Sequence, residues 1–155
     1  MSQLLRIILI VLVLGAAVLV WTELRREPVM PENEVVEEGT TTHTSLKGVE
    51  LIVTSPTTNS TITSPLIISG EAPGFWYFEA TFPVVLVNWD GLIIAEGYAT
   101  AQSDWMTEEM VPFTATLEFI QPEYGDTGAF ILQRDNPSGL PENDDAVEFP
   151  IRFVE

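Results

Sequence analysis

Apolar and polar residues alternate over much of the chain after Gly48. Residues 49–53, 113–119 and 147–153 each place apolar side chains at every second position, with polar residues between them. A period of two with one polar side is typical of antiparallel strands that cover a core on one side only. By the same reasoning, further strands are predicted over residues 66–69, 76–81, 84–89, 92–100 and 129–134.

Turn residues separate these stretches. Asp90-Gly91 lies between two apolar runs and predicts a tight two-residue hairpin. Prolines and glycines break the chain elsewhere, as in the run Asn136-Pro137-Ser138-Gly139. About eight short strands within roughly 108 residues predict an all-β fold, an immunoglobulin-like Greek-key sandwich of two sheets.

The N-terminus has a different pattern. Residues 7–21 read IILIVLVLGAAVLVW without a charge, and the apolar segment 4–22 can cross a bilayer as a helix of about 28 Å. We therefore predict a transmembrane anchor over residues 1–22, which makes the membrane a partner. A cleaved signal peptide, with small residues at 15–17, is the alternative, although the apolar run continues past that point.

A polar segment follows the predicted anchor. Residues 23–47 contain prolines, clustered glutamates and a threonine-rich run without a sustained apolar period, so we predict an acidic, flexible linker. His43 is the only histidine in the chain and falls in this linker, where we expect it to be solvated. The globular domain is then predicted to span residues 48–155.

Composition narrows the chemistry. The chain carries 23 acidic and 6 basic residues, and from Gly48 onward 17 acidic residues face two arginines, a formal charge of −15. Such a polyanion repels phosphate backbones, which argues against nucleic acids as partners. The absence of cysteine excludes disulfides, thiolate nucleophiles and attachment through a lipid-modified cysteine. Because the one histidine lies in the linker, a Ser-His-Asp triad is excluded as well, and we predict neither enzyme activity nor a cofactor.

Aromatic residues provide one set of candidate binding positions, because Trp and Tyr supply much of the energy at binding surfaces. A stacking platform for sugars or peptides is one interpretation, and burial in the core is the other. Strand alternation would send Trp76 and Phe78 inward and leave Phe75 and Tyr77 on a sheet face. The candidates are Trp76, Tyr77, Trp89, Tyr98 and Trp105.

Polar residues near predicted turns provide a second set. Glu79 falls in the middle of an apolar strand, opposite Trp76, where it would either bind a ligand or accept hydrogen bonds that hold a neighbouring loop. Asp104 and the pair Asp135-Asn136 precede turns, where an Asp side chain accepts hydrogen bonds from backbone amides two residues on. Each is therefore both a binding candidate and a candidate structural residue.

An acidic loop follows Pro141. Its side-chain oxygens are of the type that binds Ca²⁺, but their spacing is not that of an EF-hand. An exposed acidic loop without a metal ion is the preferred interpretation. The candidate calcium ligands are Glu142, Asp144 and Asp145, next to Asn143.

A series of short motifs occurs in order after Leu46. They are SP (55–56), SPL (64–66), ISGEA (68–72), WYFEA (76–80), FPV (82–84), DG (90–91), DWM (104–106), PF (112–113), DNPSG (135–139) and FPI (149–151). In order and spacing they resemble the immunoglobulin-like domain of bacterial spore germination proteins. The resemblance covers nearly all of the chain after Leu46. It implies an extracytoplasmic immunoglobulin-like module, with a link to sporulation or germination, and carries over no catalytic residue.

The predicted function is that of a non-catalytic interaction or scaffolding module on a single-pass membrane anchor. Its partner would be another protein of the cell envelope, engaged by loops or by an exposed sheet edge. The alternative is a carbohydrate- or wall-binding module that uses surface aromatics. Arg25 and Arg26 outnumber Arg6, which favours a cytoplasmic domain by the positive-inside rule. The short N-terminal tail and the resemblance favour the extracytoplasmic side, which we adopt.

Overall fold

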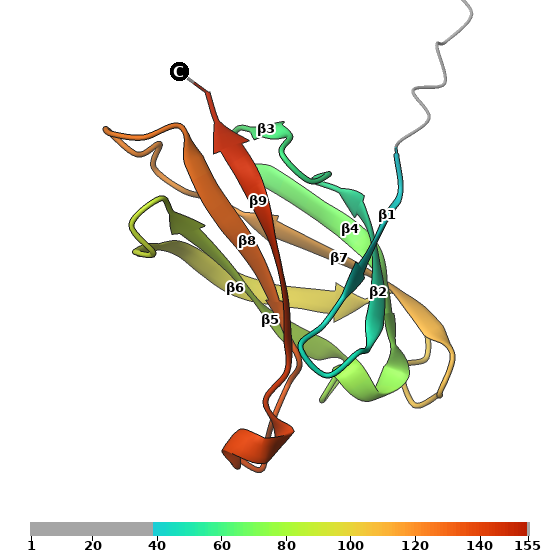
Figure 1. Ribbon diagram of the computed structural model, residues 1–155. Helices are drawn as coiled ribbons and strands as arrows, with labels where there is room; N and C mark the ends of the chain where they lie inside the picture. Colours follow the sequence, from blue (N-terminus) through green and yellow to red (C-terminus); the bar gives the residue numbers. More distant parts are fainter. Residues whose placement is uncertain (1–38, 155) are drawn as a thin grey trace, which may run out of the picture. The chain divides into compact units, whose positions relative to one another are not determined.

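The computed structural model describes residues 39–154, and the predicted anchor over residues 1–22 lies outside this range (Figure 1). Strands dominate the described residues, as the alternation predicts. They are β1 (Thr41–Thr44), β2 (Glu50–Ser55), β3 (Thr61–Ile62), β4 (Leu66–Pro73), β5 (Thr81–Asn88), β6 (Ile93–Ala101), β7 (Met110–Leu117), β8 (Thr127–Gln133) and β9 (Ala146–Phe153). Two short 3₁₀ helices, η1 (Gly74–Trp76) and η2 (Pro141–Asn143), join them. Between residues 39 and 154 we find no helix with the length and apolar character needed to span a bilayer.

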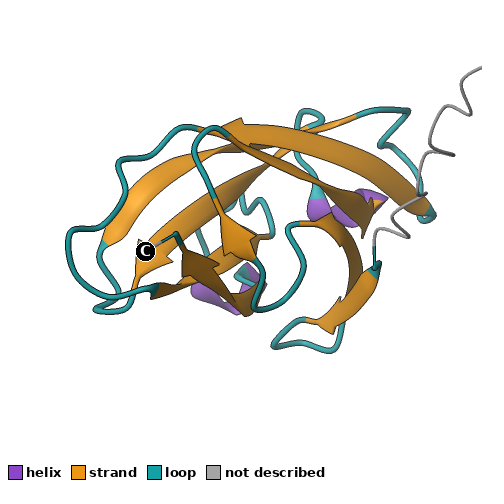
Figure 2. Cartoon of the chain, turned by 90° about the horizontal axis from the view of Figure 1, so that it is seen from above, coloured by secondary structure: helices purple, strands orange, loops and turns teal. Residues whose placement is uncertain are grey.

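The strands form one hydrogen-bonded ladder in the order β1-β2-β4-β7-β6-β5-β8-β9-β3. In the described range, β6 and β7 pair only through Thr100 with Thr114 and Ala101 with Phe113. The ladder bends at this corner, so that β1, β2, β4 and β7 form a first layer and β6, β5, β8, β9 and β3 a second (Figures 1 and 2). The chain changes layer after β2, β3, β4, β6 and β7, which gives a sandwich-like all-β fold as predicted.

The core lies between the inner faces of the two layers. In β7 and β9 every second residue is buried and its neighbours are exposed, which confirms the predicted alternation. Phe82 of β5 contacts Phe113 of β7 edge-to-face, with ring centroids 5.0 Å apart. Because these two rings come from different layers, the contact joins the layers across the core.

The hairpin predicted at Asp90-Gly91 is present between β5 and β6. Its loop is one residue longer than predicted, since the Asn88 amide donates to the Leu92 carbonyl oxygen at 3.0 Å and encloses three residues. Gly91 has a φ of 76°, which glycine adopts without strain. The Asn88 side-chain oxygen also accepts hydrogen bonds from the amides of Asp90 and Leu92.

The strand predicted over residues 76–81 is wrong. The chain forms η1 there and then a tight turn, in which Glu79 and Ala80 have φ values of 49° and 63°. Gly74 explains this departure, because a Cβ atom at that position would collide with the carbonyl oxygens of Thr107 and Trp105. The close approach of two backbones therefore overrides the apolar pattern at this point.

The linker predicted to reach residue 47 ends earlier. Thr41–Thr44 form β1, which pairs with β2 from Thr41 opposite Val53 to Thr44 opposite Glu50. His43 is half-buried rather than solvated, because its ring stacks on Phe149 of β9 with centroids 4.4 Å apart. Threonine is a β-branched residue and favours strands, and this preference explains why a polar segment forms β1.

Candidate functional site

Four segments meet at one end of the sandwich, which we call the loop end: residues 45–49, 74–80, 102–109 and 134–145. Backbone hydrogen bonds join them. The Leu46 amide donates to Ala146 at 3.3 Å, the Gly74 amide to Glu109 at 3.1 Å, and the Asp135 amide to Trp76 at 3.0 Å. In Figure 1 the β8–β9 loop lies at the bottom, while β1 begins at the top, where the C-terminus also lies.

The loop end brings together most of the candidate residues predicted from sequence. Glu79, Asp104 and Trp105 lie on two of its segments, and Trp76 packs beneath them. Two candidates lie elsewhere: Trp89 is in the β5–β6 hairpin at the opposite end, where its ring covers Gly125, and Tyr98 is exposed on β6. Asp135, Asn136, Glu142, Asp144 and Asp145 all belong to the β8–β9 loop.

Burial in the core, the second interpretation of the aromatic residues, is confirmed for Trp76. Trp76 and Tyr77 are both buried, and the Tyr77 hydroxyl donates to the Val111 carbonyl oxygen at 2.7 Å. Burial also raises the pKa of Tyr77. The Trp76 Nε1 atom is buried and has no hydrogen-bond partner among the described residues. Two consecutive aromatics can turn inward because Trp76 ends η1 and Tyr77 follows it, so neither lies on a strand, and the alternation rule predicts the wrong face for Tyr77.

Other aromatic residues at this end are exposed instead. Phe75 and Phe78 retain 49% and 42% of their accessible surface. Phe78 was expected to be buried, but the turn at Glu79 directs the chain away from the core. Glu79 itself lies exposed in that turn rather than on a strand face. The positive φ values of the turn gave no sequence signal, since neither Glu79 nor Ala80 is a glycine.

A shallow groove of about 300 Å³ lies between η1 and the β6–β7 loop. It is lined by Gly74, Phe75, Trp105, Met106, Thr107 and Glu108. Met106 is 76% exposed and Trp105 is half-buried against the core. The Arg134 guanidinium lies 5.8 Å from the centre of the Phe75 ring, and its Nε donates to the Phe75 carbonyl oxygen at 3.3 Å. Arg134 thus fixes one wall of the groove.

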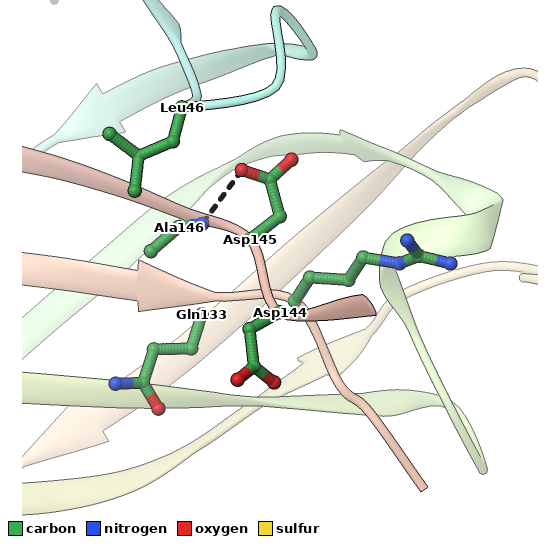
Figure 3. Close-up of a pocket in the computed structure, with 6 residues that line it drawn as sticks. Leu46, Gln133, Asp144, Asp145 and Ala146 are labelled. Carbon is green, nitrogen blue, oxygen red and sulfur yellow. Dashed lines mark hydrogen bonds between the residues drawn. The ribbon is translucent and has the colours of Figure 1, made fainter. Parts of the chain in front are cut away.

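A second pocket, of about 310 Å³, lies where the β1–β2 turn meets the start of β9 (Figure 3). It is lined by Leu46, Gln133, Arg134, Asp144, Asp145 and Ala146. The Asp145 carboxylate is buried and accepts hydrogen bonds from the Ser45 hydroxyl at 2.7 Å, the Lys47 amide at 3.2 Å and the Ala146 amide at 3.0 Å. Asp145 therefore ties the β1–β2 turn to β9.

Asn136 organises the β8–β9 loop. Its side-chain nitrogen donates to the Leu140 carbonyl oxygen at 2.8 Å and to the Asp144 carboxylate at 2.7 Å. Its side-chain oxygen accepts from the Ser138 hydroxyl, and its carbonyl oxygen accepts from the Gly139 amide. The turn predicted here is confirmed, with Asn136 rather than Asp135 supplying the side-chain contacts. Burial and the nearby charge of Glu79 raise the pKa of Asp135.

Asp104 also has a structural partner. Asp104 accepts a hydrogen bond from the Met106 amide at 3.0 Å, which confirms the turn predicted at that position. The three candidate calcium ligands do not converge on one point, because Asp145 faces the β1–β2 turn and Asp144 faces Asn136. Within residues 39–154 no group of three acidic or histidine side chains is arranged to hold a metal ion.

The comparison with protein families identifies one relationship. The model for the immunoglobulin-like domain of bacterial spore germination matches residues 50–139, more than half of the chain. This segment runs from β2 to the β8–β9 loop and includes the groove-lining residues. No curated protein and no solved structure matches the chain. On the strength of the family match, the chain belongs to the family of the immunoglobulin-like domain of bacterial spore germination.

Proposed function

We propose that this protein is a non-catalytic interaction module that recognises another protein of the cell envelope through its loop end. The observation that carries the proposal is a set of exposed apolar side chains in an acidic setting. Phe75 and Met106 flank the groove, and Asp104, Glu108 and Glu109 surround it on the same loop. We call Phe75, Trp105 and Met106 the groove patch.

The chemistry of the patch supports a protein partner. Aromatic and methionine side chains are enriched at the centre of protein interfaces, where a polar rim surrounds them. Methionine also adapts its shape to a partner surface because its side chain is unbranched and polarizable. A basic rim on the partner would match the carboxylates around the groove patch.

The position of the patch fits a tethered module. The loop end is opposite the end at which β1 begins, so the groove patch lies at the end of the domain away from Thr41 (Figure 1). We infer that residues 1–22 anchor the chain in the cytoplasmic membrane, with the domain on the extracytoplasmic side. The apolar segment 4–22 and the family support this placement. Proteinase treatment of intact protoplasts tests it: we expect digestion of the domain, and full protection would contradict an outside location.

Site-specific cross-linking in membranes tests the partner. A photo-reactive amino acid at position 106 should yield one discrete protein adduct, because Met106 is the most exposed side chain of the groove patch. The matched control is position 116, where Thr116 is exposed on the outer face of β7. Equal adducts at both positions, or none at 106, would contradict the proposal.

Carbohydrate binding is the second candidate, and the half-buried Trp105 beside Phe75 is the observation that favours it. Aromatic faces stack on sugar rings as well as on peptides. Peptidoglycan pull-down distinguishes the two functions. Retention that is lost on Trp105→Ala, with an unchanged melting temperature, would favour a wall-binding module over a protein-binding one.

A further inference from the structure

The strand β6 has an open backbone edge. On one side it pairs with β5 from Thr81 opposite Thr100 to Val87 opposite Ile93. On the other side its pairing within residues 39–154 is confined to Thr100 and Ala101, which contact β7. The residues of β6 before Thr100 therefore have no hydrogen-bonded strand on that side in the described part of the chain, although the Leu117 side chain of β7 lies next to Gly97. An unpaired row of backbone N–H and C=O groups is a template for another strand.

The register identifies the outward-facing backbone groups. Pro83 lies opposite Tyr98, and because proline has no N–H, this is a pair that does not exchange hydrogen bonds. The N–H and C=O of Tyr98 therefore point away from β5, towards the open edge. In an antiparallel ladder the direction alternates, so Glu96 also presents its backbone groups outward.

The usual protection of a sheet edge is limited here. A register shift between Leu86 and Val87 places a bulge near Ile94, which leaves residues 95–99 as regular strand. Within this stretch, Tyr98 is 65% exposed, and Glu96 is the one charged residue. The core-facing side of β6 is covered at Gly97 by the Leu117 side chain, since a Cβ atom at Gly97 would lie 2.8 Å from it. An incoming strand would thus meet a regular edge rather than an opening into the core.

We propose that the open edge of β6 binds an extended segment of a partner protein by strand addition, with Lys or Arg opposite Glu96 and an apolar side chain beside Tyr98. Main-chain hydrogen bonds would provide affinity and the alternate side chains would provide specificity. Charge complementarity selects this occupant. The part of the chain after Gly48 carries a formal charge of −15, so a second copy would bring like charges together, whereas a basic segment is attracted. This site is separate from the groove patch and does not depend on it.

A synthetic peptide on the full-length chain tests the proposal. The probe is a fluorescent ten-residue peptide of alternating lysine, threonine and valine, and its counterpart has glutamate in place of lysine. Fluorescence anisotropy should show binding of the lysine peptide, weakened about fivefold by Glu96→Lys through loss of the cross-strand charge pair. Glu96→Lys should in turn favour the glutamate peptide, which a misfolded variant would not do. The control Glu50→Lys alters an exposed residue of β2 and should leave both affinities unchanged.

Hydrogen exchange of β6 provides the second readout. In the free chain the amides of Glu96 and Tyr98 should exchange rapidly, and the lysine peptide should slow them at least tenfold. Three results would overturn the proposal. The first is slow exchange of both amides in the free chain. The second is a peptide affinity that Glu96→Lys and Glu50→Lys alter equally. The third is protection of these amides that grows with protein concentration in the absence of peptide, which would identify a second copy of the chain as the occupant. Because Phe75 and Met106 lie outside β6, a substitution in the groove patch should not change peptide binding.

Discussion

The strands and the loop end of this domain are ordered by different physical rules. In β7 and β9, burial follows a period of two, and each apolar residue packs between the layers. At the loop end, individual contacts determine the structure instead. Gly74 allows η1 to approach the backbone of the β6–β7 loop, and the Asp145 carboxylate binds the Ser45 hydroxyl of the β1–β2 turn. The alternating strands therefore form the scaffold, whereas a few specific side chains determine the shape of the surface that we propose for binding.

Removal of a core ring should have the largest effect. Phe113 is 2% exposed, contacts Phe82 and covers Gly70. Phe113→Ala should lower the free energy of unfolding by about 3–5 kcal/mol, through lost burial and a cavity. Urea unfolding of the full chain measures this, with Thr116→Ala on the outer face of β7 as the control. A loss below about 1 kcal/mol would mean that the two layers do not meet at this ring.

Gly74→Ala tests whether the close approach of η1 to the β6–β7 loop stabilises the loop end. The added Cβ would collide with the carbonyl oxygens of Thr107 and Trp105, so η1 and the β6–β7 loop must separate. We expect a loss of about 1–3 kcal/mol, as for overpacking. Hydrogen exchange should show the opening at residues 74–80 and 102–109. Gly91→Ala is unsuitable as a control because of its positive φ, so Gly39→Ala, with open space around its Cα, is used instead.

Asp145→Ala tests the connection between the β1–β2 turn and β9. The substitution removes the acceptor of the Ser45 hydroxyl and one of the two acceptors of the Lys47 amide, and we expect a loss of about 2 kcal/mol. Faster exchange should be confined to residues 45–49. The exposed neighbour provides the matched variant, since Asp144→Ala removes a hydrogen bond to Asn136 alone. Equal effects of the two substitutions would contradict the structural role of Asp145.

Asn136→Ala should have a smaller effect, because the β8–β9 loop is exposed to water. The variant loses the contacts to Leu140, Ser138 and Asp144, and we expect about 1 kcal/mol. Limited proteolysis should cut the loop faster while the core melts at nearly the same temperature. A large drop in melting temperature would show that this loop is coupled to the strands.

The smallest expected effect concerns pH. Burial against Phe149 lowers the pKa of His43 below its usual value of 6.5, so the unfolded chain binds a proton at a higher pH than the folded chain. Stability should therefore be fully present above pH 6.5 and decline as the pH falls through 6.5 towards the lowered pKa. Melting temperatures at several pH values, compared with those of His43→Phe, measure this. An identical pH dependence in both proteins would contradict the assignment.

Much of the scaffold could be predicted from the sequence, because period-two burial is a local pattern. The strands through Phe113 and Phe149 and the hairpin at Gly91 follow from neighbouring residues alone. The candidate residues near turns follow from local sequence for the same reason: Asp104 accepts from the Met106 amide, and Asn136 donates to the Leu140 carbonyl oxygen, both partners being close in sequence.

The loop end could not be predicted in the same way. The strand expected over residues 76–81 depended on an apolar run, whereas η1 depends on backbone contact with Thr107, far along the chain. The burial of Tyr77 and the pairing of Ser45 with Asp145 also arise from tertiary contacts. The stacking of His43 on Phe149 of β9 joins residues far apart in sequence, and no local pattern connects them.

The most direct test of the account is the yield of the membrane cross-link from position 106 in two matched variants. Phe75→Ser and Ile67→Ser each remove an exposed apolar side chain, one at the loop end and one on the outer face of β4, with 49% and 63% exposure. We predict that Phe75→Ser abolishes most of the adduct and that Ile67→Ser leaves it unchanged. Equal yields from the two variants would contradict the proposal that the groove patch binds the partner.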